Sequence, residues 1–449
     1  MSTSAQAATR AASTVNIGPH RGIGGLTVLT VYLVLLFGVP SGLTITALGS
    51  AGRPATLWAL GAALWWCWHQ LQRQSPLSPG PRRVSAALFA LLAIAGFSYA
   101  CAMLRGLPTD EVSPADNGLL RLLAWAGILL VGVDGLPTAA DLRVLLKRVA
   151  WAGGAMATLG IIQFLTGSLL LDFWHFVPFT VWDAPNADAL DQRAGFVRAS
   201  GTAIHPLEYG VVLTMAFPIA LALATENRSA HRLIPWLPVA AITVASLISV
   251  SRSTLIGLAV GLVIMLPTLS RNIRALIVAA GGALAVAIAV LVPGMIGTIR
   301  GMFTGLASDP STASRTNGYD IAVDYMSRFP VVGKGFGTFI TRYHIFDNQY
   351  LLLAIELGIL GALAFLVLIA AGIVSAAAAR RTATERLDRQ LAQSLIAALV
   401  AGSLMLAFFD GLSFSISSGM FFLVIGLAGG ARHLLAADAP APARPTAVR

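Results

Sequence analysis

Long apolar runs constrain the fold of this chain more than any other feature of its sequence. Only 11% of its 449 residues are charged, whereas a soluble domain is typically about a quarter charged. A helix of about 20 apolar residues crosses the ~30 Å hydrocarbon core of a bilayer. We therefore predict an all-α, polytopic membrane protein with about 12 transmembrane helices in one transmembrane domain, residues 25–431. The predicted spans are 25–47, 55–70, 84–105, 118–134, 149–170, 207–225, 233–250, 254–269, 273–298, 348–375, 391–409 and 411–431.

Lysine and arginine set the predicted orientation of these spans. Most of the 30 Lys and Arg residues fall in alternate connectors and in the two tails. The positive-inside rule places these connectors, and with them both termini, in the cytoplasm. The net charge of +10 is therefore a mark of topology, because scattered basic residues do not form the stripe that binds nucleic acid. We expect the polar tails, 1–24 and 432–449, to be disordered and cytoplasmic.

The opposite, extracytoplasmic face is predicted to carry two long loops, 171–206 and 299–347. The first loop begins with aromatic side chains, among them Trp182. They fit either an interfacial belt, with a short helix lying on the membrane, or a platform for sugar rings or a lipid chain. The loop ends with three basic side chains, Arg193, Arg198 and His205. Guanidinium groups suit phosphate oxygens and keep their charge, although arginines at this depth also reach lipid headgroups.

Two tight turns between apolar spans carry charges on the same predicted face. Arg252 lies in the first, where an arginine is costly unless it is paired, functional or in contact with headgroups. Asp410 lies in the second. A turn or N-cap role and an ion pair to one of the arginines are both open for Asp410.

The second long loop contains a predicted amphipathic helix at 315–328 and then a glycine-rich turn. It leads into the next span through a polar stretch that includes Arg342, His344, Asp347, Asn348 and Tyr350. Asp347 or Asn348 is suited to cap the following helix. In a catalytic interpretation, Asp347 or His344 is the base that takes a proton from an attacking hydroxyl. The sequence has no metal-ligand spacing, and GKGFG lacks the spacing of a Walker loop, so we expect neither a metal nor a nucleotide cofactor.

Five motifs follow one another between residues 160 and 365. They are GIIQFLTG (160–167), RASGTAIHPLEYG (198–210), SRST (251–254), SR…Y…FPVVGKGFGTF (314–339) and DNQYLLLAIELGILG (347–361). In this order they resemble the O-antigen ligase and polymerase superfamily of membrane glycosyltransferases. The last motif is similar to the family's His-Asn-x-Tyr-Leu…Glu-x-Gly-x-x-Gly signature. Asp347 stands where the family has a histidine that is implicated in catalysis in its ligases.

The resemblance implies a GT-C-like fold and a reaction at the outer face of the bacterial cytoplasmic (inner) membrane. A glycan would pass from a polyprenyl pyrophosphate donor to an acceptor hydroxyl, in cell-surface polysaccharide biosynthesis. The acceptor would be a glycan, a lipid or a protein, which leaves both a ligase and a polymerase open. The alternatives are a secondary transporter and a lipid-linked glycan flippase. Transporters bind substrate near the bilayer midplane, where this chain carries few charges.

The resemblance also assigns roles to residues of this chain. Arg198 and Arg252 would hold the pyrophosphate and stabilise the charge that grows on it, with Arg193 and Arg315 as further candidates. Asp347 or His344 would be the base in one inverting, metal-independent displacement. The remaining substrate-binding candidates are Arg342, His205, Asn348, Tyr350 and Trp182.

Overall fold

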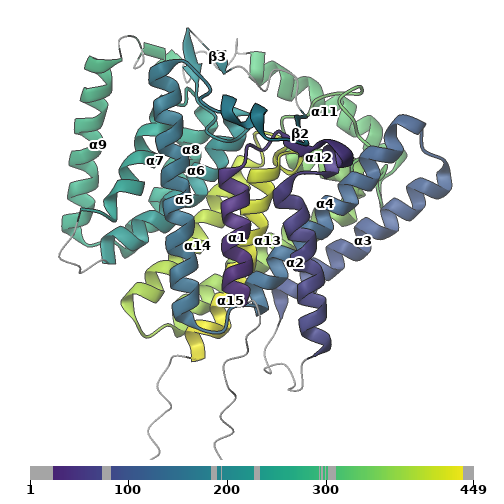
Figure 1. Ribbon diagram of the computed structural model, residues 1–449, viewed down its shortest axis with the longest axis horizontal. Coiled ribbons are helices and arrows are strands. Elements are labelled where there is room, and N and C mark those ends of the chain that lie inside the picture. The colour runs from purple at the N-terminus through teal and green to yellow at the C-terminus, as the bar shows by residue number, and fades with distance from the viewer. Residues whose placement is uncertain are drawn as a thin grey trace, which may run out of the picture.

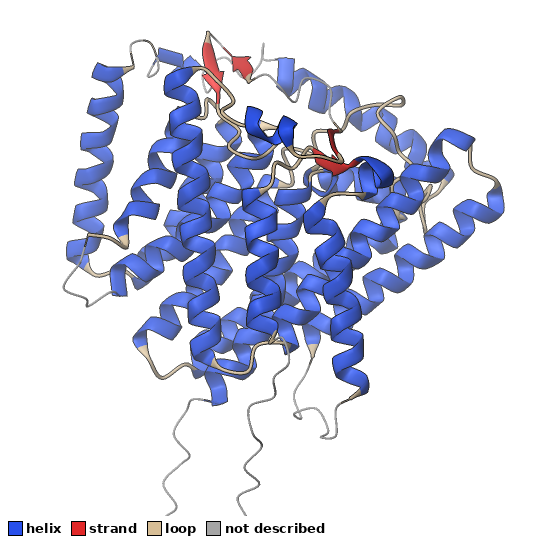
Figure 2. Ribbon diagram, viewed as in Figure 1, coloured by secondary structure: helices blue, strands red, loops and turns tan. Residues whose placement is uncertain are grey.

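The computed structural model describes residues 24–72, 82–183, 190–193, 195–226, 233–292, 294, 297–298, 300–301 and 310–437. It is a bundle of helices, with the short strands and the helix α11 gathered at one end (Figures 1 and 2). Of the predicted tails, 1–23 and 438–449 lie outside the described residues. The last helix continues to Ala437, beyond the predicted end of the last span.

Seven of the described helices are long and apolar enough to cross a membrane. They are α3 (Arg83–Arg105), α4 (Thr109–Asp134), α5 (Ala139–Thr166), α6 (Pro206–Glu226), α9 (Arg271–Leu291), α13 (Gly358–Thr382) and α15 (Ser415–Ala437). Three apolar helices are shorter, α1 (Gly25–Gly38), α7 (Trp236–Ile248) and α8 (Arg252–Met265). The bundle also contains α2 (Pro54–Leu71), α12 (Gln349–Glu356), α14 (Arg386–Met405) and the short turn η3 (Leu266–Thr268). The architecture is that of a polytopic membrane protein with helix in each predicted range, and the number of helices that cross the membrane stays a prediction.

Four helices form the centre of the bundle. The apolar windows of α6, α15 and α4 are 89%, 83% and 67% buried, and α14 packs along α6. Glycines bring α15 and α4 into close contact. A Cβ added at Gly426 would overlap the backbone of Leu129, and one at Gly430 would lie 2.6 Å from the carbonyl oxygen of Gly132. Small residues of this kind let membrane helices approach closely. In contrast, α9 stands at the margin of the bundle (Figure 1), with 6% of its window buried.

Ion pairs join the connectors at the end of the bundle where α15 finishes. Arg143 binds Asp388 at 2.6 Å and Glu385 at 2.8 Å, and Arg386 binds Glu226 at 2.9 Å. These connectors are among those that the charge bias assigns to a single side. The structure therefore gathers them at one end, while the side of the membrane that this end faces stays a prediction.

The opposite end carries the short elements of the long loops. They are β1 (Leu43–Ile45), η1 (Thr46–Ala51), η2 (Asp172–Phe176), β2 (Thr180–Trp182), β3 (Asp191–Arg193), β4 (Phe196–Arg198), α11 (Pro310–Arg328) and η5 (Gly411–Ser413). The first predicted span, 25–47, is shorter than expected, because α1 ends at Gly38 and the chain turns into β1, which pairs antiparallel with β2. β3 and β4 form a second antiparallel pair. α11 contains the amphipathic helix predicted at 315–328.

Candidate functional site

The connection between α14 and α15 is the centre of the polar residues at this end. It is fixed to the start of α12 by Gln349, which is 1% exposed. The backbone N–H of Gln349 donates to the carbonyl of Leu406 (2.9 Å), and its side-chain Oε1 accepts from the N–H of Leu412 (2.7 Å). Asp347 lies two residues before Gln349, and Asp410 lies between the two bonded positions. The two aspartates are therefore held on adjacent segments.

Asp410 interacts electrostatically with Asp347 and with Arg121 of α4. Burial raises the pKa of Asp410 to about 6; the negative charge of Asp347 adds to the rise, and Arg121 opposes it. The Arg121 guanidinium donates a long hydrogen bond to the carbonyl of Ser413 (3.4 Å). Its Nε is buried without a hydrogen-bond partner among the described residues. Both aspartates are only partly buried.

Glu208, in the first turn of α6, joins three parts of the chain beneath this connection. Its buried carboxylate accepts hydrogen bonds from the hydroxyl of Ser41 (2.9 Å), the N–H of Ile204 (3.1 Å) and the N–H of Ile416 (2.7 Å). A buried carboxylate with this many donors is well satisfied. Glu208 therefore fixes the start of α15 against the start of α6.

Charged side chains continue from Glu208 across the end of the bundle. Arg53, which precedes α2, lies within electrostatic range of both Glu208 and Arg121, and its guanidinium is 4.0 Å from the carboxylate of Asp183. Arg121 in turn interacts with Glu356, the last residue of α12. The site is thus a connected set of charges contributed by α4, α6, α12, the residue before α2 and the α14–α15 connection.

Arg198 and His205 lie immediately before α6 and border this set. Arg198 is 7% exposed and donates to the carboxylate of Asp191 at 2.7 Å across the β3–β4 pair. Burial lowers the pKa of Arg198 and Asp191 opposes the shift, so the guanidinium stays charged. The ring of His205 lies tilted against Phe414 with ring centroids 5.7 Å apart, and its Nδ1 accepts from the N–H of Leu207. Burial, and then the charge of Arg198, lower the pKa of His205 to about 4.

Arg252 is the first residue of α8 and is 8% exposed. Ser251 caps the helix, because its hydroxyl accepts from the N–H of Thr254 (3.4 Å). The first turns of α8 and α6 lie side by side, where a Cβ added at Gly210 would overlap the side chain of Thr254. Arg252 therefore lies at the same end of the bundle as Asp410.

The glycine-rich stretch after α11 is fixed to the junction of α12 and α13, backbone against backbone. The N–H of Lys334 donates to the carbonyl of Ile355 (2.8 Å). Gly333 and Gly358 face each other with φ values of 74° and 65°. A side chain on either would overlap the opposite backbone. Gly333 of GKGFG and Gly358 of ELGILG thus serve this close approach.

A buried ion pair holds the same stretch against α4. The ammonium of Lys334 lies 2.5 Å from the carboxylate of Glu111, which is fully buried. It also donates to the carbonyl of Thr338 (3.0 Å) and lies 4.4 Å from the ring centroid of Tyr343. The hydroxyl of Tyr343 donates to Glu111 as well. The chain that leads to Asp347 is therefore anchored at its base.

Residues 237–366 match the family model described as O-antigen ligase. The match supports the O-antigen ligase superfamily for this segment. The resemblance drawn from the five motifs is confirmed, and the family indicates a membrane-bound, glycan-transferring ligase or polymerase with lipid-linked glycans and membrane lipids as general partners. No curated protein matches the chain.

The O-antigen ligase segment contains Arg252 and Asp347, and the fold brings Arg198 and His205 from the preceding loop to the same end. Asn348 caps α12, as one of the two sequence alternatives predicted, because its Oδ1 accepts from the N–H groups of Tyr350 and Leu351. The Tyr350 hydroxyl donates to the carbonyl of Ser403 (2.7 Å). Asn348 and Tyr350 therefore support the helix that follows Asp347.

His344 and Arg342 lie beside α11 and α4. The ring of His344 packs edge-on against Phe346, with centroids 4.9 Å apart, and its Nε2 is buried without a hydrogen-bond partner among the described residues. It lies next to Gly318 of α11. Arg342 is half-exposed and binds Asp110 of α4.

Three other predicted site residues lie in the long loops. Trp182 of β2 lies beside His175, with ring centroids 5.4 Å apart. Arg193 ends β3 and faces Phe196 in the pairing with β4. Arg315 belongs to α11, and its side chain lies outside the described residues.

Sequence reasoning missed four charged residues of this region, Arg53, Arg121, Glu111 and Lys334. A signal for one of them was present, because Arg121 falls three residues inside a predicted span, and an ionisable residue within a span is a functional candidate by default. The other three lie in connectors, where charges are common. Among the described residues, no group of three or more His, Cys, Asp or Glu side chains is placed to hold a metal ion.

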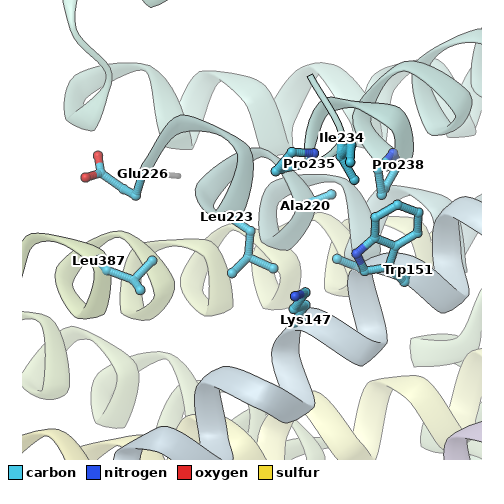
Figure 3. A pocket seen from close by; sticks show the side chains of 10 residues that line it. Lys147, Trp151, Ala220, Leu223, Glu226, Ile234, Pro235, Pro238 and Leu387 are labelled. Carbon is cyan, nitrogen blue, oxygen red and sulfur yellow. The ribbon is translucent and has the colours of Figure 1, made fainter. Parts of the chain in front are cut away.

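A cavity of about 400 Å³ opens at the other end of the bundle (Figure 3). It is lined by Lys147, Ala150, Trp151, Ala220, Leu223, Glu226, Ile234, Pro235, Pro238 and Leu387. Glu226 also belongs to the ion pairs described for that end. The cavity is therefore separate from the charged set around Asp347 and Asp410.

Proposed function

We propose that this protein transfers a glycan from a polyprenyl pyrophosphate donor to an acceptor hydroxyl, at the outer face of the bacterial inner membrane. The observation that carries the proposal is the position of Arg198, Arg252 and Asp347 at one end of a membrane bundle, within or beside an O-antigen ligase segment. A lipid diphosphate in the outer leaflet has its phosphates at this level. The bundle end that holds these groups therefore faces the extracytoplasmic side in this proposal.

The arginines bind and stabilise the diphosphate. Arg198 uses one terminal nitrogen for Asp191, and its buried Nε has no hydrogen-bond partner among the described residues. Donor capacity thus remains for phosphate oxygens. Arg252 adds a second buried cation. Fixed guanidinium groups in a poorly hydrated site stabilise the negative charge that grows on the leaving diphosphate.

Asp347 is the base in this mechanism. Its carboxylate takes the proton of the acceptor hydroxyl, whose oxygen attacks the anomeric carbon as the bond to the diphosphate breaks. A single displacement of this kind inverts the configuration. We favour Asp347 over His344, because the ring of His344 packs against Phe346 beside α11.

The test is the cell-envelope glycan profile of a deletion strain that carries Arg252→Ala or Asp347→Ala. Loss of a general base typically costs 10²–10⁴ in rate, so the glycan should be nearly absent in the Asp347 variant. Arg380→Ala is the matched control, because Arg380 is an exposed arginine in the last turn of α13. Wild-type glycan in both test variants, at normal expression, would reject glycan transfer and favour a transporter or a flippase.

The products in the deletion strain separate a ligase from a polymerase. Long chains that stay on the polyprenyl carrier indicate a missing ligase. Single repeats on the carrier indicate a missing polymerase.

A further inference from the structure

The two aspartates of the site occupy facing segments that have little freedom to separate. Gln349 bonds to the chain on both sides of Asp410, at Leu406 and Leu412. The same turn is closed by the N–H of Ser413, which donates to the carbonyl of Asp410 (2.9 Å). Backbone groups and the buried side chain of Gln349 thus hold the two segments that carry Asp347 and Asp410 side by side.

We propose that Asp410 is a positioning residue, which shares with Asp347 the proton that Asp347 takes from the acceptor hydroxyl. This inference rests on the proposed function. It gives a role to a carboxylate that no sequence motif assigned, on a segment outside the 237–366 match.

A neighbouring carboxylate would raise the pKa of Asp347, which by itself is low for a base. A histidine, the residue of the resembling family at this position, has an ordinary pKa near 6.5, whereas a lone aspartate has one near 3.9. A base is most effective when its pKa lies close to the working pH. Two neighbouring carboxylates cannot both ionise easily, so their proton is shared and their pKa values move apart. The raised pKa of Asp410 has this direction.

Two charges and one hydroxyl act on Asp410. Asp347 precedes α12, Arg121 extends from α4, and Ser413 of the same turn donates a hydrogen bond that favours the charged form. Glu356 and Arg53 act on Arg121 from the far side. Arg121 is a cation acting on Asp410, so it limits the rise of the Asp410 pKa and favours the ionised form of the pair at neutral pH.

The first test is a pH titration of carboxyl groups by infrared spectroscopy on the purified full-length protein. Wild type should show a carboxyl band that titrates near pH 6, absent from Asp410→Asn. In Asp347→Asn the midpoint of this band should fall by about one pH unit or more, because a like charge is removed. Asp320→Asn, which changes an exposed carboxylate of α11, is the control. An unchanged midpoint in Asp347→Asn would overturn the pairing, whatever the activity.

The second test is the pH dependence of glycan transfer by spheroplasts at external pH 5 to 9. On the acid side, the rate of transfer falls as the base becomes protonated. Asp410→Asn should move this fall, the acid limb of the pH–rate profile, to lower pH by about one unit, because a like charge is removed. Arg121→Gln should move the acid limb to higher pH, because a cation is removed. Opposite shifts are not expected from general loss of structure. If Arg252→Ala and Asp347→Asn keep full transfer, the proposed function fails. If both lose transfer but Asp410→Asn keeps the wild-type acid limb, the role of Asp410 alone is refuted.

Discussion

Replacing Gly358 by alanine tests whether the backbone contact between the 330–335 stretch and the α12–α13 junction holds the site together. Gly358 has φ 65°, a conformation that costs a residue with a Cβ about 1–2 kcal/mol. The new Cβ would also overlap the carbonyl of Val331 and lie 2.7 Å from the nitrogen of Gly333. Both are backbone atoms, so the whole stretch must move.

The cost of that movement follows from the hydrogen bonds that it breaks. The N–H groups of Lys334 and Gly335 donate to the carbonyls of Ile355 and Glu356, at 2.8 and 2.9 Å. A net contribution of about 1 kcal/mol for each bond, added to the conformational strain, gives a destabilisation of about 3–4 kcal/mol. Glycan transfer should fall as well, because the segment that leads to Asp347 begins at this contact.

The assay is unfolding by sodium dodecyl sulfate in mixed micelles, followed by tryptophan fluorescence. Gly281→Ala is the matched control, since Gly281 lies in α9 with no atom within 4 Å of an added Cβ and no positive φ. That change should be neutral or stabilise by up to about 1 kcal/mol. If the free energies of unfolding of the two variants differ by less than about 1 kcal/mol, the reasoning about this contact is wrong.

Two further changes probe the charges of the site. Lys334→Met leaves the carboxylate of Glu111 buried without its cation and should destabilise the protein by about 3–5 kcal/mol in the same assay; the double variant with Glu111→Gln should recover most of the loss, and a single variant as stable as wild type would contradict the assigned pair. His205 has a folded pKa of about 4, below its unfolded value near 6.5, so the unfolded state binds the proton first. Stability should therefore be complete above about pH 6.5 and fall towards pH 4, by up to about 2 kcal/mol after allowance for partial exposure, relative to His205→Gln measured in parallel. Identical pH profiles of the two proteins would show that the ring is not buried as described.

The positions of the helices could be predicted from the sequence because burial in a bilayer demands long apolar runs. The span predicted at 84–105 is the helix Arg83–Arg105, and the one at 207–225 is Pro206–Glu226. The end of the first span could not be predicted in the same way. It depends on β1, whose partner strand β2 lies far away in the sequence, and a three-residue strand leaves no periodic signal.

Residues of the candidate site could be predicted only where a single residue stands out in the sequence by itself. Arg198, Arg252 and Asp347 stand out as polar residues at the ends of apolar spans, and the fold brings them to one end. The partner proposed for Asp347 is Asp410, which also fits an ordinary turn residue by sequence. Its importance depends on Gln349 joining segments about 60 residues apart, and this is tertiary packing that no local pattern encodes.

The brevity of α7 and α8 has a consequence for the surrounding lipid. A helix of 13 residues, the length of α7, rises only about 20 Å, some 10 Å less than typical hydrocarbon thickness. A bilayer answers such mismatch by thinning around the protein. Under the proposed function, such thinning would bring headgroups and water towards Arg252, and a carrier lipid would present its diphosphate there without leaving its leaflet. The rate of glycan transfer by the reconstituted protein should accordingly fall as the acyl chains of the lipids become longer.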